Sequence, residues 1–251
     1  MKFLGIIPAR YASTRFPAKP LALLAGKPVI WHVYHNASKA LPNLVVATDN
    51  EQIFNTVRSF GGNVVMTSSE HRTGTDRCNE AYTNFGVEAD VVVNIQGDEP
   101  FINPAQLEAL KNCFSDPTVD IATLIKPFVP GTPYSVMADP NTPKAIVNFN
   151  GEAVYFSRSV IPFLRGVEKD LWSSKNTYYK HIGVYAFRAE VLKKVSQLKQ
   201  TPLELAESLE QLRWLENGLK IKTAVTDIET IGIDTPDDLA AAEEYIKHLK
   251  I

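Results

Sequence analysis

The stretch FLGIIPARYASTRFPAKPL, residues 3–21, begins with an apolar run and continues as a loop rich in proline, serine and arginine. The run at 3–7 is continuously hydrophobic, which is typical of a strand covered on both faces in a parallel sheet. Arg10, Arg15 and Lys19 follow in the loop. A buried strand therefore delivers three cations to one edge of a sheet, and this is where open α/β folds bind ligands.

The alternation of strand, loop and helix recurs through the first half of the chain. Further strands are expected at 44–48, 64–66 and 90–95, and helices at 28–40, 51–60 and 78–85. This alternation predicts a parallel sheet with helices on both faces. The polar loops 8–19, 67–77 and 96–100 each follow a strand, so we expect them to converge on one site.

The pattern changes after about residue 121. A hairpin is expected over 145–156 with its turn at Asn150-Gly151, followed by a strand at 181–187, a helix at 201–217, a strand at 222–225 and a helix at 236–249. We predict one domain, 1–251. It has a mostly parallel α/β half, 1–120, and a second half, 121–251, that carries a smaller mixed α/β extension.

Composition limits the class of protein. The chain has 251 residues, 45% of them hydrophobic, and a formal net charge of −2. These values are typical of a soluble globular protein and give no overall basic field for nucleic acid. Cys78 and Cys113 lack metal-ligand spacing and are expected to be reduced thiols. No apolar run suits a signal peptide or a membrane span, so we expect a cytoplasmic protein without a membrane partner.

The cations of the first loop indicate a phosphate ligand, because Arg and Lys supply charge and donors at close range. The loop contains neither GxxxxGK[ST] nor GxGxxG, so it is neither a P-loop nor a dinucleotide-binding loop. For any single cation, a solvated loop position remains the alternative.

The segment QGDEP, residues 96–100, places Asp98 directly after the strongest strand. Mg²⁺ binds one or two carboxylates together with water and substrate phosphates, so Asp98 is a candidate metal ligand. Asp234, which also follows a short apolar run, is the second candidate. Turn formation is the alternative for Asp98, and helix capping is the alternative for Asp234.

The loop HRTGTDR, residues 71–77, has small hydroxyl residues around a glycine, which permit close approach of a base or sugar. An ordinary surface pair is the alternative for Asp76 and Arg77. The sequence shows no partner that would make His71 a general base, so an ordinary loop histidine is the favoured interpretation.

Eight blocks, in order, resemble those of the 3-deoxy-manno-octulosonate (Kdo) cytidylyltransferase family: IPARYASTRFPAKPL, VATDN, HRTGTDR, VVNIQGDEP, YFSRSVIP, HIGVYAF, LEQLRWLENG and GIDTPDDL. The resemblance covers residues 3–242. It implies a nucleotide-diphospho-sugar transferase-like fold, a homodimer, and a Mg²⁺-dependent reaction of lipopolysaccharide biosynthesis. In that reaction the 2-hydroxyl of Kdo attacks the α-phosphate of CTP and pyrophosphate leaves.

The resemblance also implies residue roles. Nucleotide-binding residues would be Arg10, Arg15, Lys19, Thr73, Arg77 and Gln96; sugar-binding residues Arg158, His181, Tyr185, Glu210 and Gln211; metal ligands Asp98 and Asp234; and catalytic residues Lys19, Asp98 and Arg10. Packing or a subunit interface is the alternative for Arg158 and Tyr185. The family often has glycine where Ala18 stands.

Other functions remain as alternatives. A CMP-sialate synthetase shares the Arg- and Lys-bearing first loop, and an 8-amino analogue of Kdo is a possible substrate of a close variant. A nucleotide-sensing protein without catalysis would lose Lys19, Asp98 or Asp234, and all three are present. A nicotinamide-dependent oxidoreductase is disfavoured because the glycine fingerprint is missing.

Overall fold

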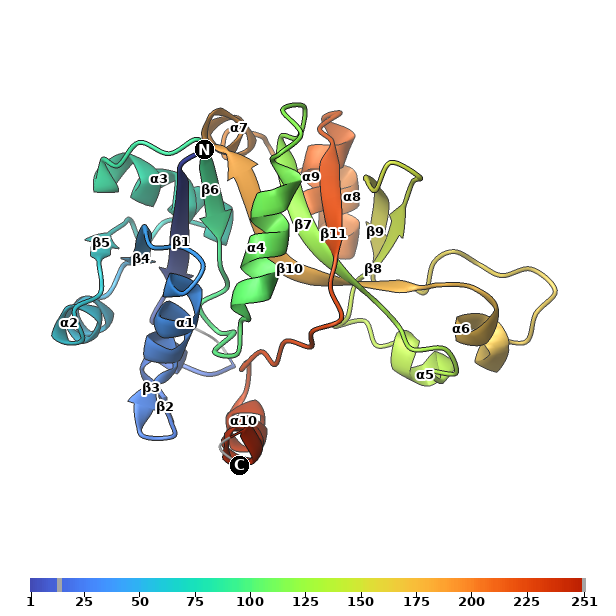
Figure 1. Cartoon of the computed structure of the whole chain (residues 1–251), viewed down its shortest axis with the longest axis horizontal. Coiled ribbons are helices and arrows are strands. Elements are labelled where there is room, and N and C mark those ends of the chain that lie inside the picture. The colour runs from blue at the N-terminus through green and yellow to red at the C-terminus, as the bar shows by residue number, and fades with distance from the viewer. Residues whose placement is uncertain (13–14, 250–251) are drawn as a thin grey trace. The chain divides into compact units, whose positions relative to one another are not determined.

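The computed structural model describes residues 1–12 and 15–249 (Figure 1). It divides into two compact units, one made of 1–108 with 229–251 and the other of 109–228. The first unit therefore includes the end of the chain, 229–251, which the sequence-based division assigns to the second half. That the whole chain is one domain stays a prediction.

The first unit is built on parallel strands in the order β6-β1-β4-β5. Its elements are β1 (Phe3–Ala9), η1 (Lys19–Leu21), β2 (Leu23–Leu24), β3 (Lys27–Pro28), α1 (Val29–Ser38), β4 (Leu44–Thr48), α2 (Glu51–Ser59), β5 (Val64–Met66), α3 (Gly74–Phe85), β6 (Val91–Asn94) and α10 (Pro236–Leu249). The continuous apolar sequences of these strands match their burial. Ile6, Val45 and Val92, for example, have no exposed surface. The predicted parallel α/β arrangement is confirmed for this unit.

The order of the strands creates a crevice beside β1. The chain runs from β1 through β4 to β5. It then crosses back past β4 and β1 to β6, which pairs with the other side of β1. Right-handed crossovers put α1 and α2 on one face and α3 on the other. Ligands bind where the strand order reverses, outside the carboxyl ends of the strands. Here that point lies between the loops after β1 and β6.

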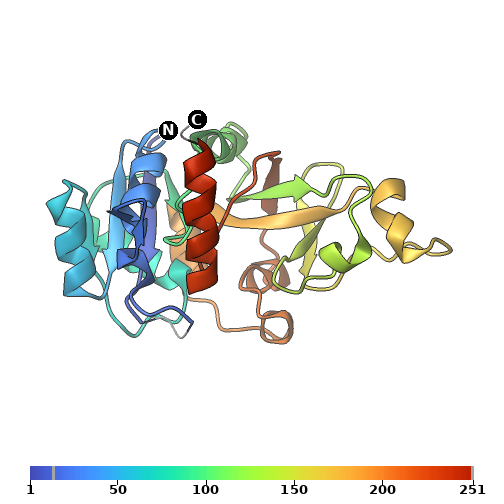
Figure 2. The ribbon, with the colours of Figure 1, turned by 90° about the horizontal axis from the view of Figure 1, so that it is seen from below.

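The C-terminal helix α10 is part of the first unit and lies beside its N-terminal segment, as Figure 2 shows. Glu243 on α10 accepts a hydrogen bond from the backbone N–H of Ala25, at 2.7 Å, and Tyr245 packs edge-on against Phe101. These contacts hold the segment before α10, which carries Asp234, on the first unit.

The second unit has a mixed sheet in the order β11-β7-β10-β8-β9, in which only the β11–β7 pair is parallel. Its elements are β7 (Ile121–Pro127), α5 (Tyr134–Met137), β8 (Lys144–Val147), β9 (Ala153–Ser157), η2 (Lys169–Leu171), α6 (Trp172–Lys175), β10 (Tyr179–Arg188), α7 (Ala189–Val195), α8 (Pro202–Glu207), α9 (Gln211–Glu216) and β11 (Ile221–Val225), while α4 (Pro104–Cys113) spans the division at 108. The hairpin predicted over 145–156 is confirmed, with Gly151 at φ 71° in its turn.

The prediction of one helix over 201–217 is wrong, because α8 ends at Glu207 and α9 begins at Gln211. Ser208 breaks the helix with a left-handed backbone, φ 51° and ψ 47°. Arg158 donates to the carbonyl oxygens of Glu207 and Ser208, so a tertiary contact holds the break open.

Cys78 is buried and Cys113 is partly buried; their reduced state stays a prediction. None of the helices in the described ranges combines the length and the apolar content needed to cross a bilayer.

Candidate active site

Gly97, in the loop after β6, lies against the end of β1 at Pro8. A Cβ at this position would lie 2.6 Å from the carbonyl oxygen of Pro8, so only glycine allows the approach. This contact brings QGDEP against the cationic first loop at the point where the strand order reverses.

A cavity of about 640 Å³ opens there. It is lined by Pro8, Ala9, Arg10, Tyr11, Ala12, Arg15, Pro17, Lys19, Pro20, His71, Arg72, Thr73, Gly74, Arg77, Gln96, Gly97, Asp98 and Asp234. The three predicted loops converge on it, and every predicted nucleotide-binding and metal-binding residue contributes to its wall.

Lys19 is the centre of the charged part of the cavity. Its Nζ donates to Asp98 Oδ2 at 2.6 Å and to Asp234 Oδ1 at 3.0 Å. Only 12% of the Lys19 side chain is exposed, against 29% for Asp98 and 47% for Asp234. Arg15 Nη2 lies 3.2 Å from Asp234 Oδ2. Two cations and two carboxylates from distant segments thus form one cluster.

Asp234 is free to join this cluster because another residue caps α10. Thr235 Oγ1 accepts from the N–H of Asp238, and Asp238 Oδ2 accepts from the N–H groups of Asp234 and Thr235. The Asp234 carboxylate instead faces Lys19, while the N–H of Ile233 donates to the carbonyl oxygen of Asp98. The capping alternative for Asp234 is therefore wrong.

The donor set of the cluster suits a magnesium ion. Two carboxylates already enclose a positive charge, that of Lys19, and Mg²⁺ characteristically takes one or two carboxylates with phosphate oxygens and water. No group of three or more His, Cys, Asp or Glu side chains within residues 1–12 and 15–249 is arranged to hold a metal alone. Asp98 and Asp234 would thus need a phosphate-bearing ligand to complete the shell.

Sequence reasoning missed Glu99. Burial raises the pKa of its carboxyl to about 8, and the negative charges of Asp98 and Asp234 add to the effect. Its Oε2 is buried and meets no hydrogen-bond partner among the described residues. Glu99 thus stays largely protonated at neutral pH and adds no third negative charge beside the two aspartates.

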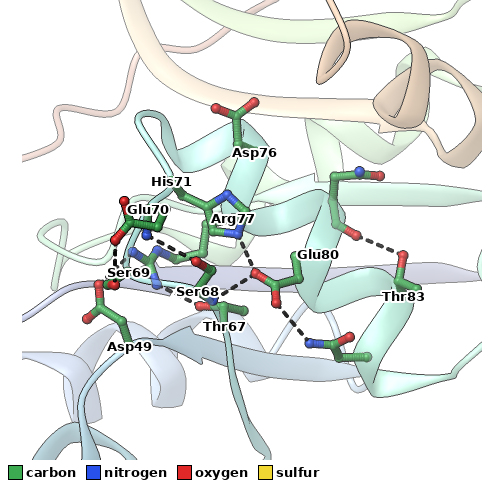
Figure 3. A network of polar contacts seen from close by, with 12 residues as sticks. Asp49, Thr67, Ser68, Ser69, Glu70, His71, Asp76, Arg77, Glu80 and Thr83 are labelled. Carbon is green, nitrogen blue, oxygen red and sulfur yellow. Dashed lines mark hydrogen bonds and ion pairs between the residues drawn. The ribbon is translucent and has the colours of Figure 1, made fainter.

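Arg77 supports the wall of the cavity from inside the fold. It is only 3% exposed, and its guanidinium donates to Thr67 Oγ1 at 2.6 Å and to Asp49 Oδ2 at 2.7 Å, as Figure 3 shows. The surface pair with Asp76 that we kept as an alternative is therefore wrong. Thr73 caps α3 by accepting from the N–H of Asp76, at 3.1 Å.

His71 has a partner that the sequence did not reveal. Its Nε2 forms a very short contact with Glu80 Oε2, and Glu80 also accepts from the N–H of Ser68 (Figure 3). The pKa of Glu80 is lowered, since these hydrogen bonds outweigh a burial effect that would raise it. The sequence did not predict this pair, because His71 lies on a loop and Glu80 on the following helix, and the two meet only when the loop folds back against the helix.

Arg158, in the second unit, is mostly engaged by backbone carbonyls. Its Nε donates to Glu207 at 2.6 Å, Nη1 to Pro140 at 2.6 Å and Nη2 to Ser208 at 3.1 Å. A guanidinium has five N–H donors, so two remain. Lys144, which is fully buried and which sequence reasoning missed, donates to the Arg158 carbonyl oxygen beneath.

His181 is held as one tautomer. The Thr123 hydroxyl has a single proton and lies 2.8 Å from the carbonyl oxygen of Val184, so it donates there and accepts from His181 Nε2 at 2.9 Å. The other ring nitrogen, Nδ1, then carries a lone pair. Burial lowers the pKa of His181 to about 3, which keeps the ring neutral.

Tyr185 stands beside His181, with ring centroids 5.3 Å apart. Burial raises the pKa of its phenol well above the usual value, and the Glu210 carboxylate adds to the shift. Gln211 is 4% exposed and begins α9. The structure therefore gathers His181, Tyr185, Glu210 and Gln211 within the second unit.

Comparison with known proteins identifies the family. Residues 4–221 match the cytidylyltransferase family. The 3-deoxy-manno-octulosonate cytidylyltransferase of Bacteroides thetaiotaomicron is 62% identical over 99% of both chains, and that of Geobacter sulfurreducens is 45% identical over 98% of this chain and 100% of its own.

Solved structures agree. CMP:2-keto-3-deoxy-manno-octonic acid synthetase, complexed with CTP, has a TM-score of 0.91 and 40% identity, covering 99% of this chain and 100% of its own. The 4-diphosphocytidyl-2C-methyl-D-erythritol synthase of Anaerococcus prevotii, at 14% identity and a TM-score of 0.62, covers 98% of this chain and 99% of its own and shares the fold alone. The predicted fold class is confirmed, and the chain belongs to the 3-deoxy-manno-octulosonate cytidylyltransferase family.

Proposed function

We propose that this protein transfers CMP from CTP to Kdo. The 2-hydroxyl oxygen of the sugar attacks the α-phosphorus in line, the bond to the β-phosphate oxygen breaks, and pyrophosphate leaves with that electron pair. The observation that carries the proposal is the cluster of Lys19, Asp98 and Asp234 in the wall of a nucleotide-sized cavity. Family membership supplies the choice of CTP and Kdo.

The cations act on the triphosphate. Such transfers need positioning and charge neutralisation more than covalent help from the protein. Lys19 is nearly buried, so its charge is weakly screened, and its three N–H donors suit the phosphate oxygens around the reacting centre. Arg10 and Arg15 are exposed at the cavity and bind the outer phosphates.

The part of the cavity wall formed by residues 71–77 and Gln96 receives the cytidine. Thr73 and Gln96 line it, and Gly74 leaves room for close approach. The buried guanidinium of Arg77 fixes the loop after β5 to β4 through Asp49 and thereby holds this wall in place. The cluster around Lys19 is left for the phosphates.

Asp98 and Asp234 would hold Mg²⁺. When bound, the ion would neutralise phosphate charge and lower the pKa of the sugar hydroxyl. Lys19 would then exchange its two carboxylates for phosphate oxygens.

The sugar binds to groups of the second unit. His181 Nδ1 accepts a hydrogen bond from a sugar hydroxyl, and Tyr185, Glu210 and Gln211 supply further donors and acceptors. The two N–H groups of Arg158 that are not bonded to carbonyls bind the sugar carboxylate. By family we also propose a cytoplasmic homodimer, with the 72% exposed Phe163 in the YFSRSVIPF segment at its interface.

The test is pyrophosphate release with purified protein, CTP and Mg²⁺. Kdo, its 8-amino analogue and N-acetylneuraminate are offered separately, and UTP replaces CTP as a control. Release with Kdo and CTP alone supports the proposal. Release only with another sugar would show that the residues of the second unit were assigned to the wrong sugar. Folded protein that binds CTP and releases nothing with any sugar would overturn it.

A further inference from the structure

Three buried polar atoms without partners gather in the second unit. They are the Tyr185 hydroxyl, Gln211 Nε2 and Trp214 Nε1, and none of them meets a hydrogen-bond partner in the described part of the chain. The three residues are 8%, 4% and 0% exposed. The rings of Tyr185 and Trp214 meet edge to face at 4.8 Å, and Gln211 lies one helical turn before Trp214 on α9.

Comparable groups in the same unit are paired. Trp172 Nε1 donates to the Val167 carbonyl oxygen at 2.9 Å, and the Tyr178 hydroxyl donates to that of Pro162 at 2.9 Å. Native proteins pair the great majority of buried polar atoms, because an unpaired one destabilises the fold. The unpaired atoms around Trp214 are therefore a departure that folding alone does not explain.

The chemistry of the cluster selects its ligand. Trp214 Nε1 and Gln211 Nε2 only donate, whereas the neutral Tyr185 hydroxyl donates and accepts. His181, whose ring contacts Tyr185, offers a lone pair on Nδ1, and Glu210 places negative charge nearby. A second carboxylate would be repelled. Neutral hydroxyls, which accept from one group and donate to the next, match this mixture.

We propose that the indole N–H of Trp214 is a further sugar-binding group, and that Trp214, Tyr185 and Gln211 remain unpaired in the free protein so that sugar hydroxyls can complete them. The inference rests on the proposed function for the identity of the sugar. Because the three atoms are closed to solvent, the side chains that cover them must move as the sugar binds. The protein thereby sacrifices some folding stability for sugar affinity.

The first experiment compares Trp214→Phe with the matched variant Trp172→Phe. Both substitutions remove buried ring volume, so Tm should fall in each, but less in Trp214→Phe, which removes an unpaired N–H, than in Trp172→Phe, which removes a paired one. In Trp214→Phe we expect KM for Kdo to increase about tenfold, the effect of one lost hydrogen bond, with KM for CTP and kcat unchanged. In Trp172→Phe, KM for Kdo should not change.

The outcome separates this inference from the proposed function. Wild-type protein without activity on Kdo would refute the function itself. Active wild-type protein together with an unchanged KM for Kdo in Trp214→Phe would overturn only the inference, as would a lower Tm with no change in KM. If Trp214→Phe fails to fold, Tyr185→Phe, which removes an unpaired hydroxyl and keeps the ring, must raise KM for Kdo without lowering Tm, whereas its control Tyr178→Phe must lower Tm and leave KM for Kdo unchanged.

A binding measurement gives an independent readout. The chain has three tryptophans, Trp31, Trp172 and Trp214. Kdo added without CTP should change the indole fluorescence of wild type and of Trp172→Phe, and the change should be absent in Trp214→Phe. An identical fluorescence change in all three proteins would contradict a contact at Trp214.

Discussion

Replacing Lys19 by methionine tests the charged cluster most directly, because the ammonium stands between two carboxylates. The two ion pairs, at 2.6 and 3.0 Å, are only partly exposed on the Lys19 side, although Asp234 is 47% exposed. After discounting for solvent we expect about 2 kcal/mol of lost stability, or a Tm lower by about 4–8 °C for a chain of this size. Methionine keeps the length and packing of the aliphatic chain.

The same substitution should separate metal binding from turnover. Without the ammonium, Asp98 loses its ion pair and Asp234 keeps only that with Arg15, so a divalent cation should bind the two carboxylates more readily. We expect Mg²⁺ to raise the Tm of Lys19→Met more than that of wild type. We expect kcat to fall by about 10²–10³, the usual loss when one group that stabilises transition-state charge is removed.

The assays are melting curves across a Mg²⁺ titration without nucleotide, and pyrophosphate release with saturating CTP and Kdo. Lys27→Met is the control, because Lys27 is exposed and lies over the Trp31 ring, outside the cavity. A kcat equal to that of wild type would show that Lys19 is an ordinary loop cation without a role in turnover. A melting curve of Lys19→Met that Mg²⁺ leaves unmoved would refute the metal assignment of Asp98 and Asp234.

Three further changes test other parts of the structure. Ala18 has a left-handed backbone, φ 56°, so Ala18→Gly should raise Tm by about 1–3 °C in calorimetry, and a lower Tm would contradict the strain. Arg77→Lys replaces a guanidinium bonded to Asp49 and Thr67 by a single ammonium. Urea unfolding should show a free energy of unfolding lower by about 2–3 kcal/mol, and CTP should bind more weakly. An unchanged free energy of unfolding would show that the buried guanidinium is not needed. His181 has a folded pKa of about 3, below its unfolded value near 6.5, so the unfolded chain binds more protons between these pH values. The free energy of unfolding should therefore fall by about 1 kcal/mol per pH unit as the pH is lowered below 6.5. Urea unfolding at several pH values should show a shallower dependence on pH for His181→Gln than for wild type. Equal pH dependence in the two proteins would contradict a buried neutral ring.

The position of the candidate nucleotide site could be predicted because it follows from topology. Each polar loop comes after a buried apolar run, and parallel strands present their carboxyl ends at the same edge. Lys19 and Asp98 therefore had to come close once β1 and β6 paired side by side.

Other features depend on contacts between segments far apart in sequence, which periodicity does not encode. Asp234 reaches Lys19 only because α10 packs on the first unit. The break at Ser208 depends on Arg158, fifty positions earlier, and the engagement of Arg158 by carbonyls has no local signal. Burial of Glu99, one residue from a solvent-facing aspartate, likewise appears only when the loop is folded.

Under the proposed function, the two sets of site residues would bind their ligands under opposite starting conditions. In the candidate nucleotide cavity, Lys19 already holds two carboxylates, so phosphate and metal would have to exchange these partners, and binding would be weaker than the sum of the new contacts. Around Trp214 the donors are unpaired, so no hydrogen bond would have to be broken and the cost lies in folding instead. Substitutions at Lys19 should therefore lower stability and activity together, whereas Tyr185→Phe, which removes an unpaired hydroxyl and keeps the ring, should lower sugar affinity without lowering stability. The change of Tm thus distinguishes the two kinds of site without any ligand present.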